Sequence, residues 1–287
     1  MTCEPVNAGQ VVWLNGRFVS VREAAISPLD RGFLYGDGVF ETIRCQNGRI
    51  LYLQDHLERM FDSLETLRIA PLPQLNWQQL AGELLIENGL SDTVASLKII
   101  VTRGTCQGFG LPACESPTVC LMVRPYHLPA SQVYRRGWRL QVALAGFAPP
   151  LAGHKSLNYL YFMLARQQAF DAGADEALIL DAHGNVAETS AGSLLARTGG
   201  SWWTPVNAHQ LPSITVRQVT NLLAGRGTVV RAREATLQDL LRAETVWVLN
   251  SLLGIMPVCR IDDHAVLNRA TDEAALLSRE LFSPHGV

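Results

Sequence analysis

The sequence has little of what would direct a protein to a membrane or to nucleic acid. None of its apolar stretches reaches the roughly 18 residues that a membrane-spanning helix needs, and the best candidate, 246–258, is interrupted by Asn250 and Gly254. The first ten residues lack the charged start and apolar centre of a signal peptide. The formal net charge of -2 provides no global basic field for nucleic acid. We therefore expect a cytoplasmic protein that binds neither a membrane nor nucleic acid.

The sequence also lacks the cysteine patterns of metal sites and disulfide frameworks. No two cysteines have C-x-x-C spacing, and no histidine-rich stretch lies near them. Zinc sites and small disulfide-stabilised domains use short, regular cysteine spacings. We therefore expect no metal site, and we interpret the thiols as buried or incidental side chains. The six cysteines are Cys3, Cys45, Cys106, Cys114, Cys120 and Cys259.

What the sequence does contain is an ordinary globular composition, with 48% apolar and 17% charged residues. Its 287 residues suffice for one large domain or two smaller ones. Strand and helix patterns mix without strict β-α-β alternation, which is typical of the α+β class. Two prolines within 124–130 indicate a linker. We predict an N-terminal α+β domain over 1–124, a linker over 125–132 and a C-terminal α+β domain over 133–287.

The strongest local signal in the first domain is Asn15-Gly16, a dipeptide that favours a two-residue turn between strands at 11–14 and 17–21. Apolar residues at helical spacing predict a helix that begins near Leu57, with Asp55 as its N-cap and Glu58 in a capping box. The other expected elements are strands at 39–45, 49–53, 96–102 and 117–123, and a helix at 77–88.

In the second domain the expected strands and helices follow one another without a regular alternation. A helix at 157–172 should be ended by Gly173, and a turn at 182–184 should separate two strands. The expected strands are 140–145, 176–180, 185–188, 228–231 and 245–249, and the further helices are 216–223 and 237–241.

Lysine is unusually scarce. Of the 24 basic residues two are lysines, which leaves 22 arginines. A lysine retained against this bias suggests a position where arginine fails, such as nucleophilic addition to a carbonyl, because only the lysine amine can be deprotonated. Composition alone leaves chance equally open. Lys98 lies in a strand pattern that allows it to face solvent, whereas Lys155 precedes a helix in a loop, where functional groups concentrate.

Several separated motifs surround Lys155 in a consistent order. They are Asp30-Arg31-Gly32-Phe33-Leu34-Tyr35-Gly36-Asp37-Gly38-Val39-Phe40-Glu41-Thr42-Ile43-Arg44, His56-Leu57-Glu58-Arg59, Lys155-Ser156-Leu157-Asn158-Tyr159, Glu176-Ala177, Glu188-Thr189, Leu211-Pro212-Ser213-Ile214-Thr215 and Asn250-Ser251-Leu252. With these motifs the chain resembles the fold type IV pyridoxal-phosphate enzymes (the class IV aminotransferases) from about Val12 to Val258. This group contains branched-chain aminotransferases, D-amino acid aminotransferases and 4-amino-4-deoxychorismate lyases. The resemblance implies a two-domain α+β fold like that of D-amino acid aminotransferase, and pyridoxal 5'-phosphate as cofactor.

The resemblance assigns a role to each matching residue. Lys155 matches the catalytic lysine that forms a Schiff base with the cofactor and then shuttles protons at the substrate carbon. Glu188 matches the carboxylate that keeps the pyridine nitrogen protonated, which makes the ring an electron sink. Tyr159 matches the phenol that hydrogen-bonds the ring oxygen. Without the resemblance, Glu188 would be interpreted as an exposed hairpin residue and Tyr159 as a core aromatic.

The other matches concern the phosphate group and the substrate. Arg59, Ser251 and the backbone of Ile214 and Thr215 match phosphate donors, the last two at a helix start where anions bind readily. The matches near the substrate are Tyr35, Phe40, Arg44 and Arg103. Strand packing, surface charge and helix-surface positions explain the individual residues nearly as well.

The segment 250–258, from Asn250 into Pro257-Val258, resembles the lyase branch more than the aminotransferase branch, and Thr102-Arg103-Gly104-Thr105 also fits the lyases. Against this, Gln107 and its neighbours stand where the lyases often carry a second arginine. We therefore predict a lyase that converts 4-amino-4-deoxychorismate to 4-aminobenzoate and pyruvate, with a branched-chain or D-amino acid aminotransferase as the alternative. A binding module without turnover is a third reading. The resemblance further implies a small-molecule amino substrate and a homodimer.

Overall fold

The computed structural model describes residues 9–143, 149–267 and 270–283. The chain divides into two compact units. The N-terminal unit comprises Met1–His127 and Lys155–Asn158, and the C-terminal unit comprises Leu128–His154 and Tyr159–Val287. The change of unit after His127 falls within the predicted linker. The prediction placed Lys155 in the C-terminal domain, whereas Lys155–Asn158 group with the N-terminal unit.

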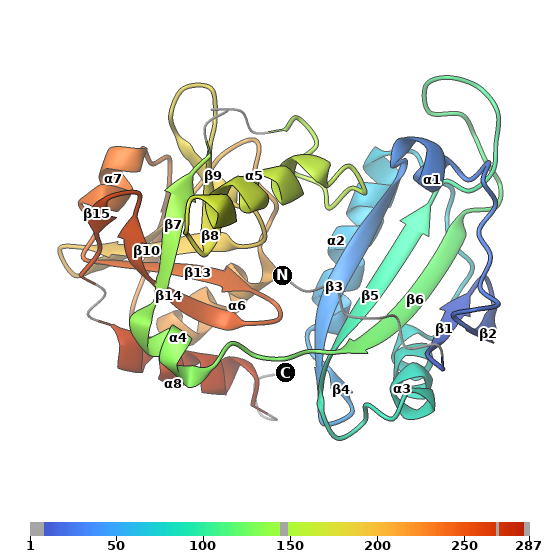
Figure 1. The fold of residues 1–287 in the computed structure, drawn as a ribbon, viewed down its shortest axis with the longest axis horizontal. Helices are drawn as coiled ribbons and strands as arrows, with labels where there is room; N and C mark the ends of the chain where they lie inside the picture. Colours follow the sequence, from blue (N-terminus) through green and yellow to red (C-terminus); the bar gives the residue numbers. More distant parts are fainter. Residues whose placement is uncertain (1–8, 144–148, 268–269, 284–287) are drawn as a thin grey trace. The chain divides into compact units, whose positions relative to one another are not determined.

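The N-terminal unit is built on a six-stranded antiparallel sheet with the order β2-β1-β6-β5-β3-β4. Its strands are β1 (Val11–Leu14), β2 (Arg17–Ser20), β3 (Gly38–Gln46), β4 (Arg49–Ile50), β5 (Val94–Thr102) and β6 (Thr118–Pro125). The helices are α1 (Arg31–Tyr35), α2 (Leu53–Thr66) and α3 (Trp77–Glu87), of which α2 and α3 cover one face of the sheet (Figure 1).

Alternation along β5 shows why one face of this sheet is covered. Ala95, Leu97, Ile99 and Val101 are fully buried against residues of α2 and α3, whereas Ser96, Lys98 and Ile100 are half-buried on the opposite face. Successive side chains of a strand point to opposite faces, so the core forms on one side only. Phe40 and Lys98, considered below, lie on the opposite face, whereas Glu41 pairs with Ile99 and lies on the face that α2 covers.

The Asn15-Gly16 hairpin is confirmed: both residues have positive φ, 45° and 91°, as this tight turn requires. The predicted start of α2 is wrong. The helix begins at Leu53, its N-cap is Tyr52 with φ 56°, and it has no side-chain cap. The reason is that β4 ends at Ile50, so the chain turns at once into the helix and Asp55 lies inside the first turn.

The segment Lys155–Asn158 lies along the beginning of β3. The N–H of Phe40 donates to the carbonyl of Lys155 at 2.8 Å, and the N–H of Leu157 donates to the carbonyl of Gly38 at 2.9 Å. Gly38 is required here because a Cβ at this position would lie 2.4 Å from the carbonyl oxygen of Val101. The backbone of the segment is therefore held by the same strand that carries Phe40 and Glu41.

The C-terminal unit is built on a nine-stranded mixed sheet with the order β12-β11-β10-β13-β14-β7-β8-β9, and β15 pairs with β14. The strands are β7 (Trp138–Val142), β8 (Glu176–Leu180), β9 (Val186–Thr189), β10 (Ser193–Thr198), β11 (Ser201–Pro205), β12 (Val230–Arg233), β13 (Thr245–Asn250), β14 (Gly254–Ile261) and β15 (His264–Ala265). β9 also approaches β10 and β11, so the sheet curls on itself. The predicted strand 140–145 ends at Val142, and its residues 144 and 145 lie outside the described residues.

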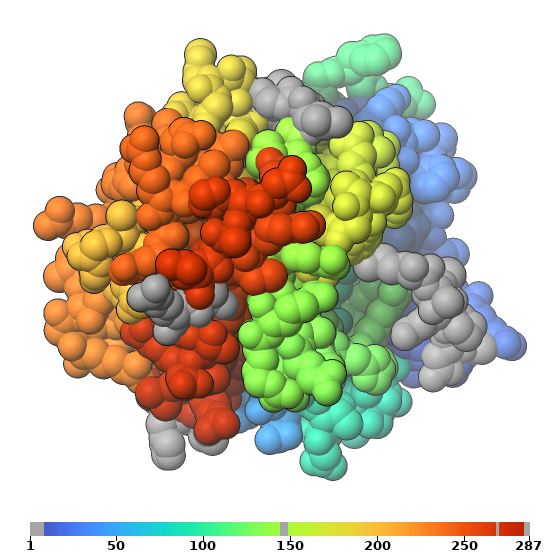
Figure 2. All heavy atoms as spheres, turned by 60° about the vertical axis from the view of Figure 1, so that its left-hand side comes forward, coloured from blue at the N-terminus to red at the C-terminus, as the bar shows by residue number. Residues whose placement is uncertain are grey.

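The helices of this unit are α4 (Ser131–Arg136), α5 (Leu160–Asp171), α6 (Ile214–Ala224), α7 (Leu237–Leu241) and α8 (Thr271–Leu281). α5 packs on β8, and α6 packs on β13 (Figure 1). α4 and α8 both pack on β14 and lie side by side, as the light green and red surfaces of Figure 2 show. Within the described ranges, none of the helices has the length and apolarity to cross a membrane.

The predicted α+β class is confirmed. Of the predicted elements, 237–241 agrees with α7 residue for residue, and the strand predicted at 228–231 is shifted to 230–233. The prediction omitted α1, α4, α8, β10, β11, β14 and β15.

Candidate functional site

In the N-terminal unit both lysines of the chain lie against one aromatic ring. The ammonium of Lys155 is 4.7 Å from the centroid of the Phe40 ring, and that of Lys98 is 4.5 Å from the same centroid. Lys98 is opposite Thr42 on the neighbouring strand, which makes it a diagonal neighbour of Phe40. Lys98 is only partly exposed: its side chain is half-buried, and burial, together with the charge of Arg124, lowers its pKa.

Glu41, the residue after Phe40, is a buried acid that sequence reasoning did not assign. The carboxylate of Glu41 on β3 accepts hydrogen bonds from His56 Nδ1 at 2.7 Å, Arg59 Nε at 2.8 Å and Arg59 Nη2 at 2.7 Å. His56 and Arg59 are three residues apart and so share one face of α2. Burial alone would raise the pKa of Glu41, but the hydrogen bonds from His56 and Arg59 outweigh it and lower the pKa to about 2.

The charge state of His56 follows from the same contacts. Burial lowers its pKa and Glu41 opposes this effect, while the positive charges of Arg59 and Lys155 lower the pKa further. Because an ionised carboxylate can only accept, Nδ1 of His56 must carry the proton of the bond to Glu41. A neutral His56 and a bidentate Arg59 therefore share one anion, which fixes the predicted phosphate residue Arg59 in orientation.

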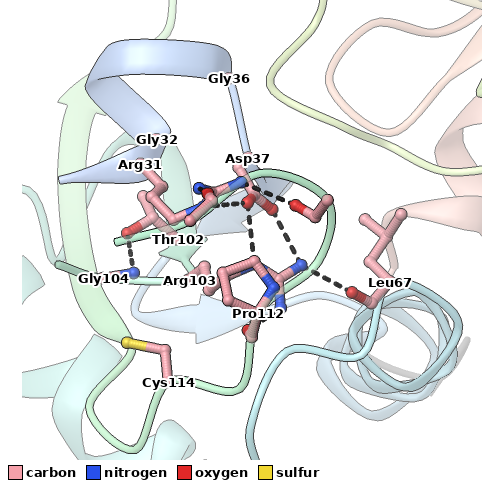
Figure 3. A network of polar contacts seen from close by, with 12 residues as sticks. Arg31, Gly32, Gly36, Asp37, Leu67, Thr102, Arg103, Gly104, Pro112 and Cys114 are labelled. Carbon is pink, nitrogen blue, oxygen red and sulfur yellow. Dashed lines mark hydrogen bonds and ion pairs between the residues drawn. The ribbon is translucent and has the colours of Figure 1, made fainter. Parts of the chain in front are cut away.

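A second polar network lies just before the start of β3 and is centred on Asp37 (Figure 3). Asp37 Oδ2 accepts from Arg31 Nε at 2.7 Å and from Arg103 Nε at 2.8 Å, and its Oδ1 accepts from Arg103 Nη2 at 3.0 Å. Arg31 also donates to the carbonyls of Gly108 and Gly110 at 2.8 and 2.9 Å. The network thus holds the loop after β5 to the start of β3.

This network gives Arg103 a structural role instead of the predicted contact with substrate. Besides its bonds to Asp37, it donates to the carbonyls of Leu67, Arg68 and Pro112. A guanidinium has five N–H groups, and the hydrogen bonds of Arg103 account for all five within the unit. Its side chain is 0% exposed, so no donor remains for a substrate carboxylate.

The other two residues predicted near the substrate differ in exposure. Arg44 is buried, and its Nε and Nη2 donate to Gln46 Oε1 at 3.1 and 2.8 Å. Tyr35 is exposed on α1, and the Arg31 guanidinium lies 5.0 Å from its ring centroid. Neither residue belongs to the cluster around Phe40 that the described contacts define.

The C-terminal unit carries the remaining predicted cofactor residues. The hydroxyl of Tyr159, just before α5, donates to the carbonyl of Ser190 at 2.8 Å. Glu188 lies on β9 opposite Ile179 and is 6% exposed. The expectation of an ordinary exposed hairpin glutamate therefore does not describe Glu188, and its burial calls for a partner of opposite charge or a hydrogen-bond donor.

Two backbone features in this unit offer donors for an anion. α6 begins at Ile214 after the N-cap Ser213, whose hydroxyl accepts from the N–H of Val216 at 3.2 Å. The first N–H groups of a helix have no partner inside the helix and favour anions, and Ile214 and Thr215 occupy these positions. They are buried, 5% and 4% exposed.

Ser251 lies in the turn between β13 and β14, which Asn250 stabilises. Asn250 Oδ1 accepts the N–H groups of Leu252 and Leu253 at 3.0 and 2.9 Å, and its Nδ2 donates to the carbonyl of Ala191 at 3.0 Å. Asn250 therefore joins the turn that bears Ser251 to the turn that follows Glu188. Within the described residues, no group of three or more His, Cys, Asp or Glu side chains is arranged to hold a metal ion.

Comparison with known proteins identifies the family. A family model described as "Amino-transferase class IV" matches residues 38–261, more than half of the chain. The chain belongs to this family. The class IV relatives are pyridoxal-phosphate enzymes, so the predicted enzyme class and cofactor are confirmed at the level of the family.

The relatives of this class IV chain span more than one activity. A "Putative branched-chain-amino-acid aminotransferase" of Methanocaldococcus jannaschii is 33% identical over 274 residues, which cover 94% of each chain. An "Aminodeoxychorismate lyase" of Vibrio harveyi is 33% identical over 259 residues, 87% of this chain and 90% of the relative. Among solved structures, a T.th. branched-chain amino acid aminotransferase with pyridoxamine 5'-phosphate is 26% identical, with a TM-score of 0.88 and coverage of 96% of this chain and 94% of that one.

The residues present fit such a cofactor. A primary amine, a buried carboxylate, a phenol and a set of anion donors are the groups that its aldehyde, ring nitrogen, ring oxygen and phosphate require. Sequence reasoning missed Glu41, Asp37 and Asn250 as supporting residues. The available signal for Glu41 was an acidic residue directly after the apolar Val39-Phe40 in the strand 38–46.

Proposed function

We propose that this class IV enzyme is a lyase that converts 4-amino-4-deoxychorismate to 4-aminobenzoate and pyruvate, using pyridoxal phosphate bound covalently to Lys155. The observation that carries the proposal is the position of Lys155. Its backbone is fixed on β3, and its amine lies over Phe40 near the buried Glu41–His56–Arg59 cluster. The amine of Lys155 must be released from the cofactor carbon and then take a proton from a carbon of the substrate. A fixed backbone with the side chain lying over the Phe40 ring suits both steps.

The remaining groups of the cofactor have matching partners in the chain. By resemblance, the phosphate donors are Arg59 in the N-terminal unit, and the first N–H groups of α6 and the Ser251 hydroxyl in the C-terminal unit. Glu188 would keep the ring nitrogen protonated, and the single hydrogen of the Tyr159 hydroxyl would turn from the Ser190 carbonyl to the ring oxygen when the cofactor binds. When bound, the cofactor supplies an electron sink for the charge left after a proton is removed beside the substrate amine. Lys155, once its amine is released, would accept that proton.

Lys98 supports an acidic substrate. It shares the Phe40 ring with Lys155, and an ammonium group in a half-buried setting favours a carboxylate as its partner. The substrate 4-amino-4-deoxychorismate carries carboxylate groups, whereas the side chains of branched-chain amino acids carry none. We therefore transfer to Lys98 the substrate contact that sequence reasoning had assigned to Arg103.

The first experiment tests the covalent bond to the cofactor. We expect the purified enzyme to show a visible cofactor band, and borohydride to fix the cofactor to the peptide that contains residue 155. Lys155→Ala should abolish both signals. Lys98→Ala, the matched control at the other lysine, should keep both. Label on residue 98, or none on the wild type, would refute the assignment of Lys155.

A second experiment separates the lyase from the aminotransferase, which the Methanocaldococcus jannaschii relative favours. The lyase should release pyruvate from 4-amino-4-deoxychorismate without any keto-acid acceptor. An aminotransferase would instead need 2-oxoglutarate or pyruvate to complete a turnover with a branched-chain or D-amino acid. Acceptor-dependent turnover of these amino acids, with no release of pyruvate from 4-amino-4-deoxychorismate, would exclude the lyase. We also propose a cytoplasmic homodimer, for which light scattering and cell fractionation are the tests.

A further inference from the structure

The C-terminal unit contains a buried carboxylate to which the proposed chemistry gives no part. Glu176, the first residue of β8, is 0% exposed. Its Oε1 accepts the N–H of Ala177 at 2.7 Å and a short hydrogen bond from the hydroxyl of Ser190. Burial raises the pKa of Glu176. Burial of a carboxyl group costs free energy of folding unless the group is hydrogen-bonded. The hydrogen bonds at Oε1 should therefore be the reason why Glu176 occupies this buried position.

The charge of Arg166 lowers the pKa of Glu176, but Arg166 makes no hydrogen bond to it. Arg166 Nη1 is 3.8 Å from Glu176 Oε2, which is too long for a hydrogen bond, and the arginine side chain is 33% exposed. Across the residues that the structure describes, Oε2 of Glu176 and Nε of Arg166 have no hydrogen-bond partner. The well-formed contacts of Glu176 therefore all lie on the side of Oε1, where they fix Ser190.

Ser190 belongs to a turn that is held from several sides. Its N–H donates to the carbonyl of Ala177 at 3.1 Å, and both the N–H and the hydroxyl of Thr189 donate to the carbonyl of Gly192 at 2.8 Å. A Cβ on Gly192 would lie 2.9 Å from the carbonyl oxygen of Leu249, so this turn packs directly on β13. The Ser190 side chain thus ties the turn to the start of β8.

The same turn joins two of the proposed cofactor residues. The carbonyl of Ser190 accepts the Tyr159 hydroxyl at 2.8 Å, and Glu188 lies two residues before Ser190 at the end of β9. The Ser190 hydroxyl is therefore fixed by Glu176, and the Ser190 carbonyl in turn orients the Tyr159 phenol. Displacement of Ser190 would move the acceptor of Tyr159 and the backbone next to Glu188 together.

We propose that Glu176 is a positioning residue. Through Ser190 it fixes the end of β9, and it holds the Tyr159 phenol in place until the phenol hydrogen turns to the cofactor. This inference rests on the proposed cofactor roles of Tyr159 and Glu188. Its effect is exerted through hydrogen-bond geometry at Oε1, so a neutral side chain of the same shape with an acceptor in that place should serve equally well.

The test compares Glu176→Ala, Glu176→Gln and Ser190→Ala in the cofactor-loaded enzyme. Two quantities are measured. One is the dissociation constant of pyridoxal phosphate, and the other is the pH midpoint of the titration of the visible cofactor band, called the half-change pH below. Glu176→Ala should weaken binding about tenfold, since two buried donors lose their acceptor. It should also raise the half-change pH by about half a unit, because a displaced phenol stabilises the anionic ring oxygen less well. Ser190→Ala should change both in the same direction, and Glu176→Gln should behave like the wild type.

A control separates positioning from general stability. Leu180→Ala removes a buried side chain at the other end of β8. It should lower the unfolding midpoint without moving the half-change pH. The inference is overturned if Glu176→Ala keeps the wild-type band and affinity, if Glu176→Gln is as impaired as Glu176→Ala, or if Leu180→Ala moves the half-change pH equally. If Glu176→Ala does not fold, Ser190→Ala and Glu176→Gln decide between the same outcomes. A wild type without the borohydride-sensitive band would refute the cofactor assignment instead.

Discussion

Removal of the Asp37 carboxylate should lower the free energy of unfolding of the N-terminal unit much more than removal of a comparable surface carboxylate. Asp37 accepts three hydrogen bonds from Arg31 and Arg103, whose side chains are 7% and 0% exposed. In Asp37→Ala both guanidinium groups keep their backbone acceptors but lose their counter-ion. Loss of one partner from a buried ion pair costs about 3 kcal/mol or more, and three lost charge-assisted hydrogen bonds lead to a similar estimate.

Asp175 is the matched control, because it also pairs with two arginines but at the surface. Arg136 and Arg139, its partners, have side chains 48% and 36% exposed. Solvent screens such pairs, so Asp175→Ala should cost about 1 kcal/mol or less. With a urea m-value of about 2 kcal/mol/M, Asp37→Ala should lower the unfolding midpoint by about 1.5 M and Asp175→Ala by about 0.5 M or less.

The assay is urea denaturation followed by circular dichroism, with hydrogen exchange on peptides of β3 and β5 to assign the change to the N-terminal unit. The pKa of Asp37 is lowered: burial opposes this, but the hydrogen bonds from Arg103 and Arg31 prevail. Its stabilisation should therefore be complete at neutral pH and decline as the pH falls below about 4. Equal midpoints for Asp37→Ala and Asp175→Ala, or a difference that does not shrink in acid, would refute this account of the network.

Three further predictions concern the sheet of the N-terminal unit. Glu41→Gln should weaken pyridoxal-phosphate binding about tenfold, because Arg59 loses its anionic partner. Since the pKa of Glu41 is lowered to about 2, the stability difference between wild type and Glu41→Gln should persist at pH 4 and close only as the pH approaches that value. In steady-state kinetics, Lys98→Met should raise KM for an acidic substrate about tenfold and leave the visible cofactor band unchanged; an unchanged KM would remove Lys98 from the substrate site. Gly38→Ala should lower the thermal midpoint and the cofactor occupancy together, because its Cβ would lie 2.4 Å from the carbonyl oxygen of Val101; full occupancy at wild-type stability would contradict this.

The features that sequence reasoning predicted well are those decided by neighbours in the sequence. The Asn15-Gly16 hairpin depends on two residues that tolerate positive φ, and α7 depends on the Thr236–Asp239 capping box. The start of α2 was predicted wrongly because its chemical signal, Asp55, lies within the first turn, while the actual start depends on where β4 ends. Local capping rules cannot anticipate a helix start set by strand pairing.

For the site, the sequence predicted the important residue types more successfully than it predicted the positions of their partners. The scarcity of lysine pointed to Lys155, but the same count could not show that Lys98 lies over the same ring, since this follows from the pairing of β3 with β5. Arg103 matched a motif, yet its five N–H groups are used by Asp37 and by backbone carbonyls of Leu67, Arg68 and Pro112. Such long-range contacts are absent from any local pattern.

The return of Lys155–Asn158 to the N-terminal unit has a consequence for biosynthesis. A nascent chain released from the ribosomal tunnel only as far as His127 lacks the four residues that pair with the start of β3. The start of β3 can complete its backbone pairing only after residues 128–154, all of which belong to the other unit, have emerged from the ribosome. A gene divided after His127 would therefore encode a first fragment without its final backbone pairings and a second fragment that carries Lys155 without the strand that holds its backbone.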